Sequence, residues 1–359
     1  MFVRRIQKLK KKIKQEKLDG VLISSVSNIT YLTGYANFSR EEREAYIFIG
    51  NNFAYIITDG RYSEAVKKQV PHLQLFERGN GKSTKDLFKR HKKEIKKIGI
   101  EEDNLTVAEH RVLKKHFKNL KHFSVSRSIK DEKEIEKIEK AAKLGDKTFK
   151  FILGKIKSGI TEKKLAFEIE LFIKTGGGDI SFPTIIGFGK NSSVPHHQTG
   201  NAKLKKRDFV LLDFGIKLEE YCSDMTRTVF FGSPNKEQRK IYEVVLKAQK
   251  RAVDFINSCL KSGKEIKASM VDKVARDYIT FRGYPPISHS LGHGIGLEVH
   301  EHPHLSPKSK DILREGMVFS IEPGIYLPDF GGIRIEDLFV LGKHGVKQIT
   351  NSPKNLIEV

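Results

Sequence analysis

Residues 209–231 read FVLLDFGIKLEEYCSDMTRTVFF, and this stretch decides the architecture of the larger part of the chain. Its two apolar, β-favouring runs predict strands at Phe209–Phe214 and Tyr221–Phe231, joined by a short loop. Each run is interrupted by one aspartate, Asp213 in the first and Asp224 in the second. A carboxylate within a buried strand is costly unless a cation or a partner neutralises it. The pair therefore predicts a shared cation site across two strands. The alternative is that strand alternation turns both aspartates toward solvent.

Three further segments carry potential metal ligands. They read GHGIGLEVHE at 292–301, FSIEPG at 319–324 and GGIRIED at 331–337. Their candidates are His293, Glu322 and Glu336. Glycines on both sides of the histidine allow close approach of the backbone, and a Pro-Gly pair ends the strand that presents Glu322. For Glu336 the alternative is a surface ion pair with Arg334, on the same strand face. Four carboxylates and one imidazole together predict hydrolysis at a centre of two metal ions.

Histidines crowd into one region of the chain. Five of the 13 histidines lie between residues 289 and 304: His289, His293, His300, His302 and His304. His196 and His197 follow a Ser-Ser-Val-Pro sequence, where one contacts substrate or both are exposed loop residues. No Gly-x-Ser-x-Gly elbow, Cys-x-x-Cys pair or His-Glu-x-x-His helix occurs, so a covalent nucleophile and a thiolate zinc site are disfavoured.

Composition indicates a globular protein of two domains. The chain has 359 residues, 38% hydrophobic and 31% charged, with two cysteines. We expect a cytoplasmic protein, without membrane association, because no signal peptide or long apolar run is present. The net charge of +22 lies mostly before residue 131, where 29 Lys and Arg face 14 Asp and Glu. These lysines alternate with apolar residues at helical spacing, so solvated helix faces explain them better than specific nucleic-acid binding.

The pattern of elements predicts an α/β N-terminal domain, 1–127, followed by an α+β catalytic domain, 128–359. In the first domain, helices are expected at 8–18, 63–69, 84–98 and 107–120, and strands at 20–24, 45–50 and 54–58. In the second, helices are expected from about 140 to 157 and at 161–174, 236–258 and 264–281. Helices followed by strands thus occur twice in this domain.

The sequence resembles the pita-bread metallopeptidases, which include Xaa-Pro aminopeptidases, Xaa-Pro dipeptidases (prolidases), methionine aminopeptidase and creatinase. The catalytic resemblance rests on the five ligand segments quoted above. The stretch DGVLISSVSNITYLTGY at 19–35 and Asp59-Gly60-Arg61-Tyr62 resemble a creatinase-type N-terminal domain. The resemblance covers nearly the whole chain.

The resemblance implies roles for individual residues. It makes Asp213, Asp224, His293, Glu322 and Glu336 the ligands of two divalent ions, with Glu322 also a proton shuttle. It places His196, His289 and His300 in the substrate pocket, His196 and His300 stabilising the substrate carbonyl, and Arg334 is a further candidate for binding substrate. The oxygen-rich ligand set favours Mn²⁺, with Co²⁺ or Zn²⁺ as alternatives. The family implies proline-containing peptides as substrates and a homodimer.

The choice of substrate length depends on His304. Prolidases often carry an arginine there, which anchors the carboxylate of a dipeptide, and an imidazole is a weaker anchor. We therefore expect an Xaa-Pro aminopeptidase, with an Xaa-Pro dipeptidase as the alternative. Methionine aminopeptidase is disfavoured by the N-terminal domain and creatinase by the complete ligand set. A non-enzymatic protein that binds peptide or nucleic acid on the same scaffold is the remaining rival.

Overall fold

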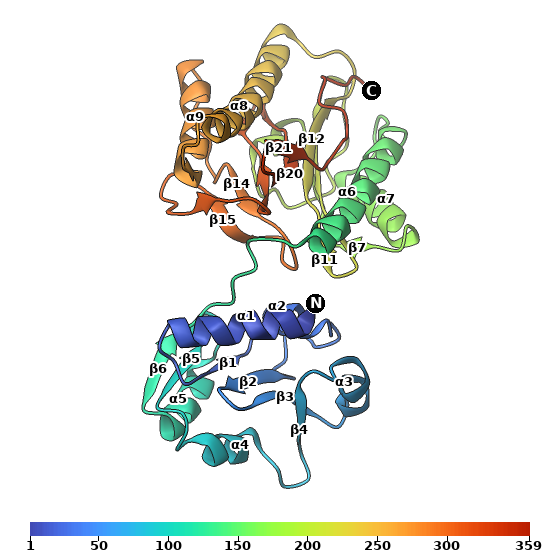
Figure 1. Ribbon diagram of the computed structural model, residues 1–359. Coiled ribbons are helices and arrows are strands. Elements are labelled where there is room, and N and C mark those ends of the chain that lie inside the picture. Colours follow the sequence, from blue (N-terminus) through green and yellow to red (C-terminus); the bar gives the residue numbers. More distant parts are fainter. The chain divides into compact units, whose positions relative to one another are not determined.

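The computed structural model describes residues 1–359, which divide into two compact units, Met1–Ser126 and Arg127–Val359 (Figure 1). The expected division between 127 and 128 lies one residue from this boundary. No helix is both long enough and apolar enough to cross a bilayer.

The N-terminal unit is a six-stranded mixed sheet with helices on both faces (Figure 1). Its strand order is β4-β3-β2-β1-β5-β6, with antiparallel pairing of β2 to β1 and β3 and parallel pairing elsewhere. The strands are β1 (Gly20–Ile23), β2 (Tyr46–Gly50), β3 (Ala54–Asp59), β4 (Gln74–Arg78), β5 (Lys97–Ile100) and β6 (Asn119–His122). The helices are α1 (Phe2–Gln15), α2 (Val26–Thr33), α3 (Ser63–Gln69), α4 (Thr84–His91) and α5 (Val107–His116).

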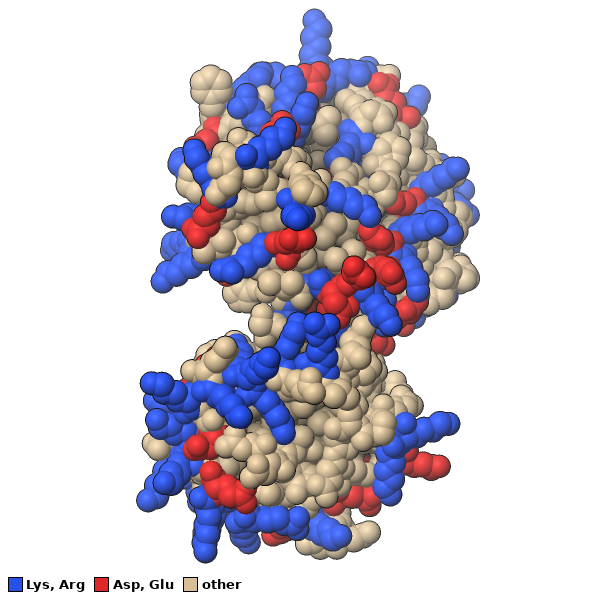
Figure 2. Space-filling model, viewed as in Figure 1, with Lys and Arg blue, Asp and Glu red and all other residues tan.

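Side-chain alternation along the central strand explains why both faces are covered. In β1, Val21 and Ile23 join the core beneath α1, α2 and α3, whereas Leu22 joins the core beneath α4 and α5. The α1 helix buries Ile6, Leu9 and Ile13 and exposes most of its lysines, as its amphipathic spacing predicts. Figure 2 shows Lys and Arg side chains spread over the drawn faces of both units.

Two predicted helices of this unit are too long. The helix expected at 84–98 ends at His91, and its remaining residues lead into the buried strand β5. The helix expected at 107–120 ends at His116, and β6 follows it. In both places, residues whose local pattern also fits a helix form a parallel strand instead. Burial of these residues between the helical layers outweighs their local helix propensity.

The C-terminal unit contains two main sheets, each with a pair of helices. The first sheet has the order β12-β9-β8 and shares its core with α6 and α7. The second has the order β15-β14-β17-β20-β21, and its core includes α8 and α9. The helices are α6 (Glu132–Leu153), α7 (Glu162–Thr175), α8 (Lys236–Lys261), α9 (Ala268–Phe281) and the 3₁₀ helix η1 (Gly189–Ser193). This is the predicted α+β arrangement.

The strands of these two sheets are β8 (Ile185–Phe188), β9 (Phe209–Phe214), β12 (Met225–Phe230), β14 (Gly292–Gly294), β15 (Glu301–Leu305), β17 (Val318–Ile321), β20 (Asp337–Leu341) and β21 (Val346–Gln348). Smaller sheets are formed by β7 (Asp179–Ile180), β10 (Ile216–Leu218) and β11 (Tyr221–Cys222), by β13 (Ile266–Lys267) and β16 (Ile312–Leu313), and by β18 (Gly324–Leu327) and β19 (Gly331–Arg334). The strand expected at 221–231 is therefore two strands, and Asp224 lies in the break between them. The helix expected at 264–281 begins only at Ala268.

Candidate active site

The β9–β12 pair brings the two aspartates together. Asp213 on β9 pairs with Thr226 on β12, and Asp224 lies immediately before β12. Both are buried, with exposed fractions of 8% and 5%. The alternative in which both aspartates face solvent is therefore wrong.

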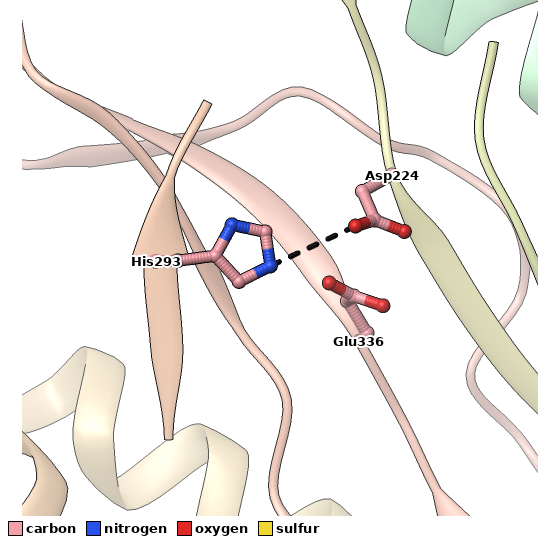
Figure 3. A group of neighbouring side chains, drawn as sticks. All are labelled: Asp224, His293 and Glu336. Carbon is pink, nitrogen blue, oxygen red and sulfur yellow. Dashed lines mark ion pairs between the residues drawn. The ribbon is translucent and has the colours of Figure 1, made fainter. Parts of the chain in front are cut away.

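Asp224 meets two residues from distant segments, His293 on β14 and Glu336 just after β19 (Figure 3). One potential ligand atom from each residue lies within 4.8 Å of the other two. The imidazole Nε2 of His293 lies 3.7 Å from Oδ2 of Asp224 and 3.4 Å from Oε1 of Glu322. Glu336 is 2% exposed. The alternative of a surface Arg–Glu pair is therefore wrong for Glu336.

Hydrogen bonding leaves a lone pair of His293 facing these carboxylates. Its Nδ1 lies 3.1 Å from the carbonyl oxygen of Gly294, which accepts only if Nδ1 carries the proton. Burial first, and the neighbouring His300 second, lower the pKa of His293 to about 3, so the imidazole is neutral. Nε2 is then an acceptor that faces other acceptors. A cation between them resolves this arrangement.

The carboxyl groups show the same lack of a positive partner. Burial first, and the nearby carboxylates second, raise the pKa values of Asp224 and Glu336 well above the ordinary range. Oδ1 of Asp224 and Oε1 of Glu336 are buried without a hydrogen-bond donor. Orphaned carboxylate oxygens next to a neutral imidazole fit a divalent metal. With Asp213 and Glu322 beside them, the donor set is rich enough in oxygen for two ions.

Asp213 is held by Arg334 on β19. The guanidinium Nη2 lies 2.7 Å from Oδ2 of Asp213, and Nε donates to the Thr226 hydroxyl at 3.0 Å. That hydroxyl donates in turn to Oε2 of Glu336 at 2.8 Å. One arginine thus orients two of the predicted ligands, one directly and one through a threonine.

The same arginine also reaches the substrate-side histidines. Its Nη1 donates to the Tyr326 hydroxyl at 2.8 Å, and this hydroxyl lies 2.8 Å from Nε2 of His289. All three nitrogens of Arg334 therefore have acceptors within the protein, although the residue was predicted to bind substrate. Burial first, and Arg334 second, lower the pKa of His289 to about 4. His289 is thus neutral and accepts a hydrogen bond from the Tyr326 hydroxyl.

These residues surround one cavity of about 770 Å³. All five predicted ligands and all four predicted substrate residues line it: Asp213, Asp224, His293, Glu322, Glu336, His196, His289, His300 and Arg334. His196 and His300 are exposed on its wall, and the rings of His300 and His293 lie 4.3 Å apart in an edge-on arrangement. His304 also lines the cavity, whereas His302 bonds to Asp311 outside it.

Several residues of the site have little signal in the sequence. Ser320 accepts from the backbone N–H of His293 at 3.0 Å and donates to Glu322 at 3.2 Å, and its only hint is its spacing of two from Glu322. Thr226 and Tyr326 read as ordinary strand residues. Glu162, at the first turn of α7, binds the segment that carries His196 and gives no local signal.

Comparison with known proteins identifies the family of the chain. Residues 136–343 match the model of metallopeptidase family M24, and residues 5–135 match that of the creatinase/prolidase N-terminal domain. An Xaa-Pro dipeptidase of Pyrococcus horikoshii is 36% identical over 98% of this chain and 98% of its own. Two solved structures are similar to this one. An Xaa-Pro dipeptidase from Bacillus anthracis has a TM-score of 0.92 and 34% identity, and the match covers 100% of both chains. An X-Pro aminopeptidase from Thermotoga maritima has a TM-score of 0.83 and 32% identity, and the match covers 96% of this chain and 98% of that one.

These matches confirm the predicted two-domain type and the pita-bread fold of the catalytic unit. They also show the divalent-metal hydrolase class that the ligand segments predict. The chain belongs to metallopeptidase family M24 and carries the creatinase/prolidase N-terminal domain of that family's Xaa-Pro peptidases.

Proposed function

We propose that this peptidase hydrolyses the bond between an N-terminal residue and a following proline, and that the dipeptide Xaa-Pro is its main substrate. The convergence of His293 with unpartnered carboxylates in a cavity carries the metal-dependent part of the proposal. Similarity over the full chain to proteins named Xaa-Pro dipeptidase supports the dipeptide. This order reverses the expectation from the sequence, in which the aminopeptidase came first.

The cavity provides an apolar wall suited to a proline ring. Phe182, Ile185 and Val299 line it together with the histidines. A pyrrolidine ring buried there gains about 25 cal/mol per Å² of apolar surface. The polar edge of the peptide would then face the metal ligands.

Asp213, Asp224, His293, Glu322 and Glu336 would hold two divalent ions, Mn²⁺ being favoured by four carboxylates and one imidazole. Bound ions of this kind lower the pKa of a shared water and stabilise charge that develops on the substrate carbonyl. Among the five, Glu322 is the most exposed, and it faces both His289 and His293. We assign it the transfer of a proton toward the leaving proline nitrogen.

His196 and His300 would donate hydrogen bonds to the substrate carbonyl oxygen, because their exposed rings line the cavity. Arg334 is assigned a positioning role, because its three nitrogens already contact Asp213, Tyr326 and Thr226. It holds ligands in place and leaves substrate contacts to the histidines.

An Xaa-Pro aminopeptidase acting on longer peptides is the second candidate. His304 lines the cavity, and burial first, then the nearby His302, lower its pKa. A neutral imidazole anchors a dipeptide carboxylate weakly. The solved X-Pro aminopeptidase of Thermotoga maritima also covers nearly the whole chain.

A manganese-supplemented assay separates the candidates. Xaa-Pro, Xaa-Pro-Yaa and Xaa-Ala peptides would be compared with the same enzyme preparation. A preference for Xaa-Pro supports the dipeptidase, and a preference for Xaa-Pro-Yaa supports the aminopeptidase. Equal cleavage of Xaa-Ala would contradict proline specificity.

A further inference from the structure

The carboxylate of Glu162 lies at the centre of a buried hydrogen-bond cluster beside the substrate cavity. Glu162 is 0% exposed and begins α7. Its Oε1 accepts from the backbone N–H of Phe188 at 2.9 Å and from the Asn191 side chain at 2.8 Å. Its Oε2 faces Nε2 of His197 and the backbone N–H of Gly200, each at 2.9 Å.

These four groups come from one segment, residues 188–200, and they flank His196. Two of them precede it in the sequence and two follow it. One carboxylate therefore joins both ends of the segment that presents His196 to the cavity. The helix start is bonded to the same region, because the backbone N–H of Lys163 donates to the carbonyl oxygen of Gly200 at 2.9 Å.

Little apolar packing holds this segment near His196. Val194 is 51% exposed, and His196 and Gln198 are also exposed. A loop with few buried apolar contacts depends on its polar contacts for a single conformation. Thr199 is a further anchor after His196, because its hydroxyl accepts from the N–H of Ile186 and donates to the carbonyl oxygen of Thr184. Before His196, the N–H of Gly332 donates to the Ser192 hydroxyl at 2.7 Å, and Arg334 donates to the carbonyl oxygen of Pro195 at 3.4 Å. Glu162 contacts the segment on both sides of His196.

We propose that Glu162 is a positioning residue for catalysis, which holds segment 188–200 so that His196 faces the substrate. The inference rests on the proposed function, because it gives His196 a contact with the substrate. His197 is the partner that transmits this control, since it is adjacent to His196 and bonds to the carboxylate. A carboxylate offers two acceptor oxygens to these four groups, whereas an amide offers one oxygen and adds a donor of its own.

The first test is a double-mutant cycle between Glu162→Gln and His196→Ala, measured as kcat and KM on an Xaa-Pro dipeptide. In the wild-type background, Glu162→Gln should lower kcat/KM by about 100-fold, because displacement of a catalytic group by about 1 Å has such an effect. In the His196→Ala background the same change should cost less than about threefold, since residues that act together are not additive. The matched control is Glu168→Gln on the outer side of the same helix, where the carboxylate pairs with Lys155 and Lys164 at the surface.

Equal losses in both backgrounds would overturn the proposal, because they would show an effect independent of His196. Wild-type kcat/KM in Glu162→Gln would overturn it as well. If the wild-type enzyme itself cleaves no Xaa-Pro peptide, the proposed function fails, and that result is distinct from either of these.

A second pair of variants keeps the proposal testable if Glu162→Gln does not fold. His197→Gln retains an N–H donor at a reach similar to that of Nε2, whereas His197→Leu removes it. We expect His197→Leu to lower kcat by about tenfold more than His197→Gln, with unchanged metal content, because one hydrogen bond to a carboxylate is lost. Equal activity of the two variants would overturn the role of this contact.

Discussion

The guanidinium of Arg334 lies 2.7 Å from the carboxylate of Asp213, and their side chains are only 5% and 11% exposed. A proposed metal ligand is therefore paired with a fixed cation of the protein. The pairing orients Asp213, while Asp224 and Glu336 have no comparable partner. Removal of the arginine should thus affect both the stability and the metal affinity of the protein.

We expect Arg334→Met to destabilise the metal-free protein by about 3 kcal/mol, because breaking a buried ion pair leaves one charge without a partner. Metal affinity should also fall by about 10–100-fold, as with the loss of other groups that orient ligands. Thermal unfolding and metal titration would measure the two effects. Arg239→Met, which breaks the exposed pair with Glu358, is the control and should cost less than about 1 kcal/mol. An equal cost for both variants would contradict the role assigned to Arg334.

The unpaired carboxyl groups predict a pH-dependent effect of metal on stability. Burial first, and carboxylate repulsion second, raise the pKa values of Asp224 and Glu336 in the metal-free protein. A carboxyl group whose pKa is raised in the folded state contributes stability that is fully present below its ordinary pKa of about 4. This stability is lost as the pH rises through the raised pKa of the folded state. A bound cation removes that loss.

The difference in Tm between manganese-loaded and chelator-treated protein should therefore grow as the pH rises from about 4 toward neutrality. Metal binding near neutral pH should also release protons, which calorimetry in buffers of different ionisation enthalpy would detect. A difference in Tm that stays constant with pH would contradict the electrostatic account of the site.

Asp224→Asn separates stability from function at the same position. The variant should lose turnover, because a ligand is weakened and Asp224 contributes to the metal cluster. In the metal-free state it should nevertheless be more stable than the wild type by about 1 kcal/mol or more at neutral pH, because a buried like-charge interaction is removed. Asp254→Asn, at an exposed position on α8, is the control and should change neither property. Full activity of Asp224→Asn would reject the assignment of this residue as a ligand.

The candidate metal ligands could be selected from the sequence because several are polar residues that interrupt apolar, β-favouring runs, as Asp213 does in β9. Their burial explains the pattern, since a carboxylate within the core is tolerated only where it is paired, hydrogen-bonded or bound to a cation. The contacts that orient them were not predictable in the same way. Tyr326 and Thr226 are residues that occur in any strand. Thr226 also contacts Glu336 across more than 100 residues of sequence.

Local pattern also failed where tertiary packing decides the element. No element was predicted at 26–33, where β-branched residues lower helix propensity, yet α2 forms because Ile29 and Leu32 are buried in the core below it. The Lys-rich stretch after His91 fits helical spacing, and only its place between β1 and β6 makes Ile98 and Ile100 part of a strand. Sequence periodicity alone contains no information about such parallel neighbours.

His304 offers a test of substrate length. The His304 side chain lines the cavity and forms no ion pair with an acidic residue. The neighbouring His302 ring, by contrast, lies 2.9 Å from the carboxylate of Asp311. His304→Arg would place a permanent positive charge at the cavity wall, and a guanidinium can bind a carboxylate through two parallel hydrogen bonds. We expect the ratio of kcat/KM for Xaa-Pro over Xaa-Pro-Yaa to rise by about tenfold, chiefly through a lower KM for the dipeptide. His344→Arg, in the turn between β20 and β21 and outside the cavity lining, is the control for added charge. If both variants change the ratio equally, His304 does not control substrate length, and the dipeptide carboxylate is recognised elsewhere in the cavity.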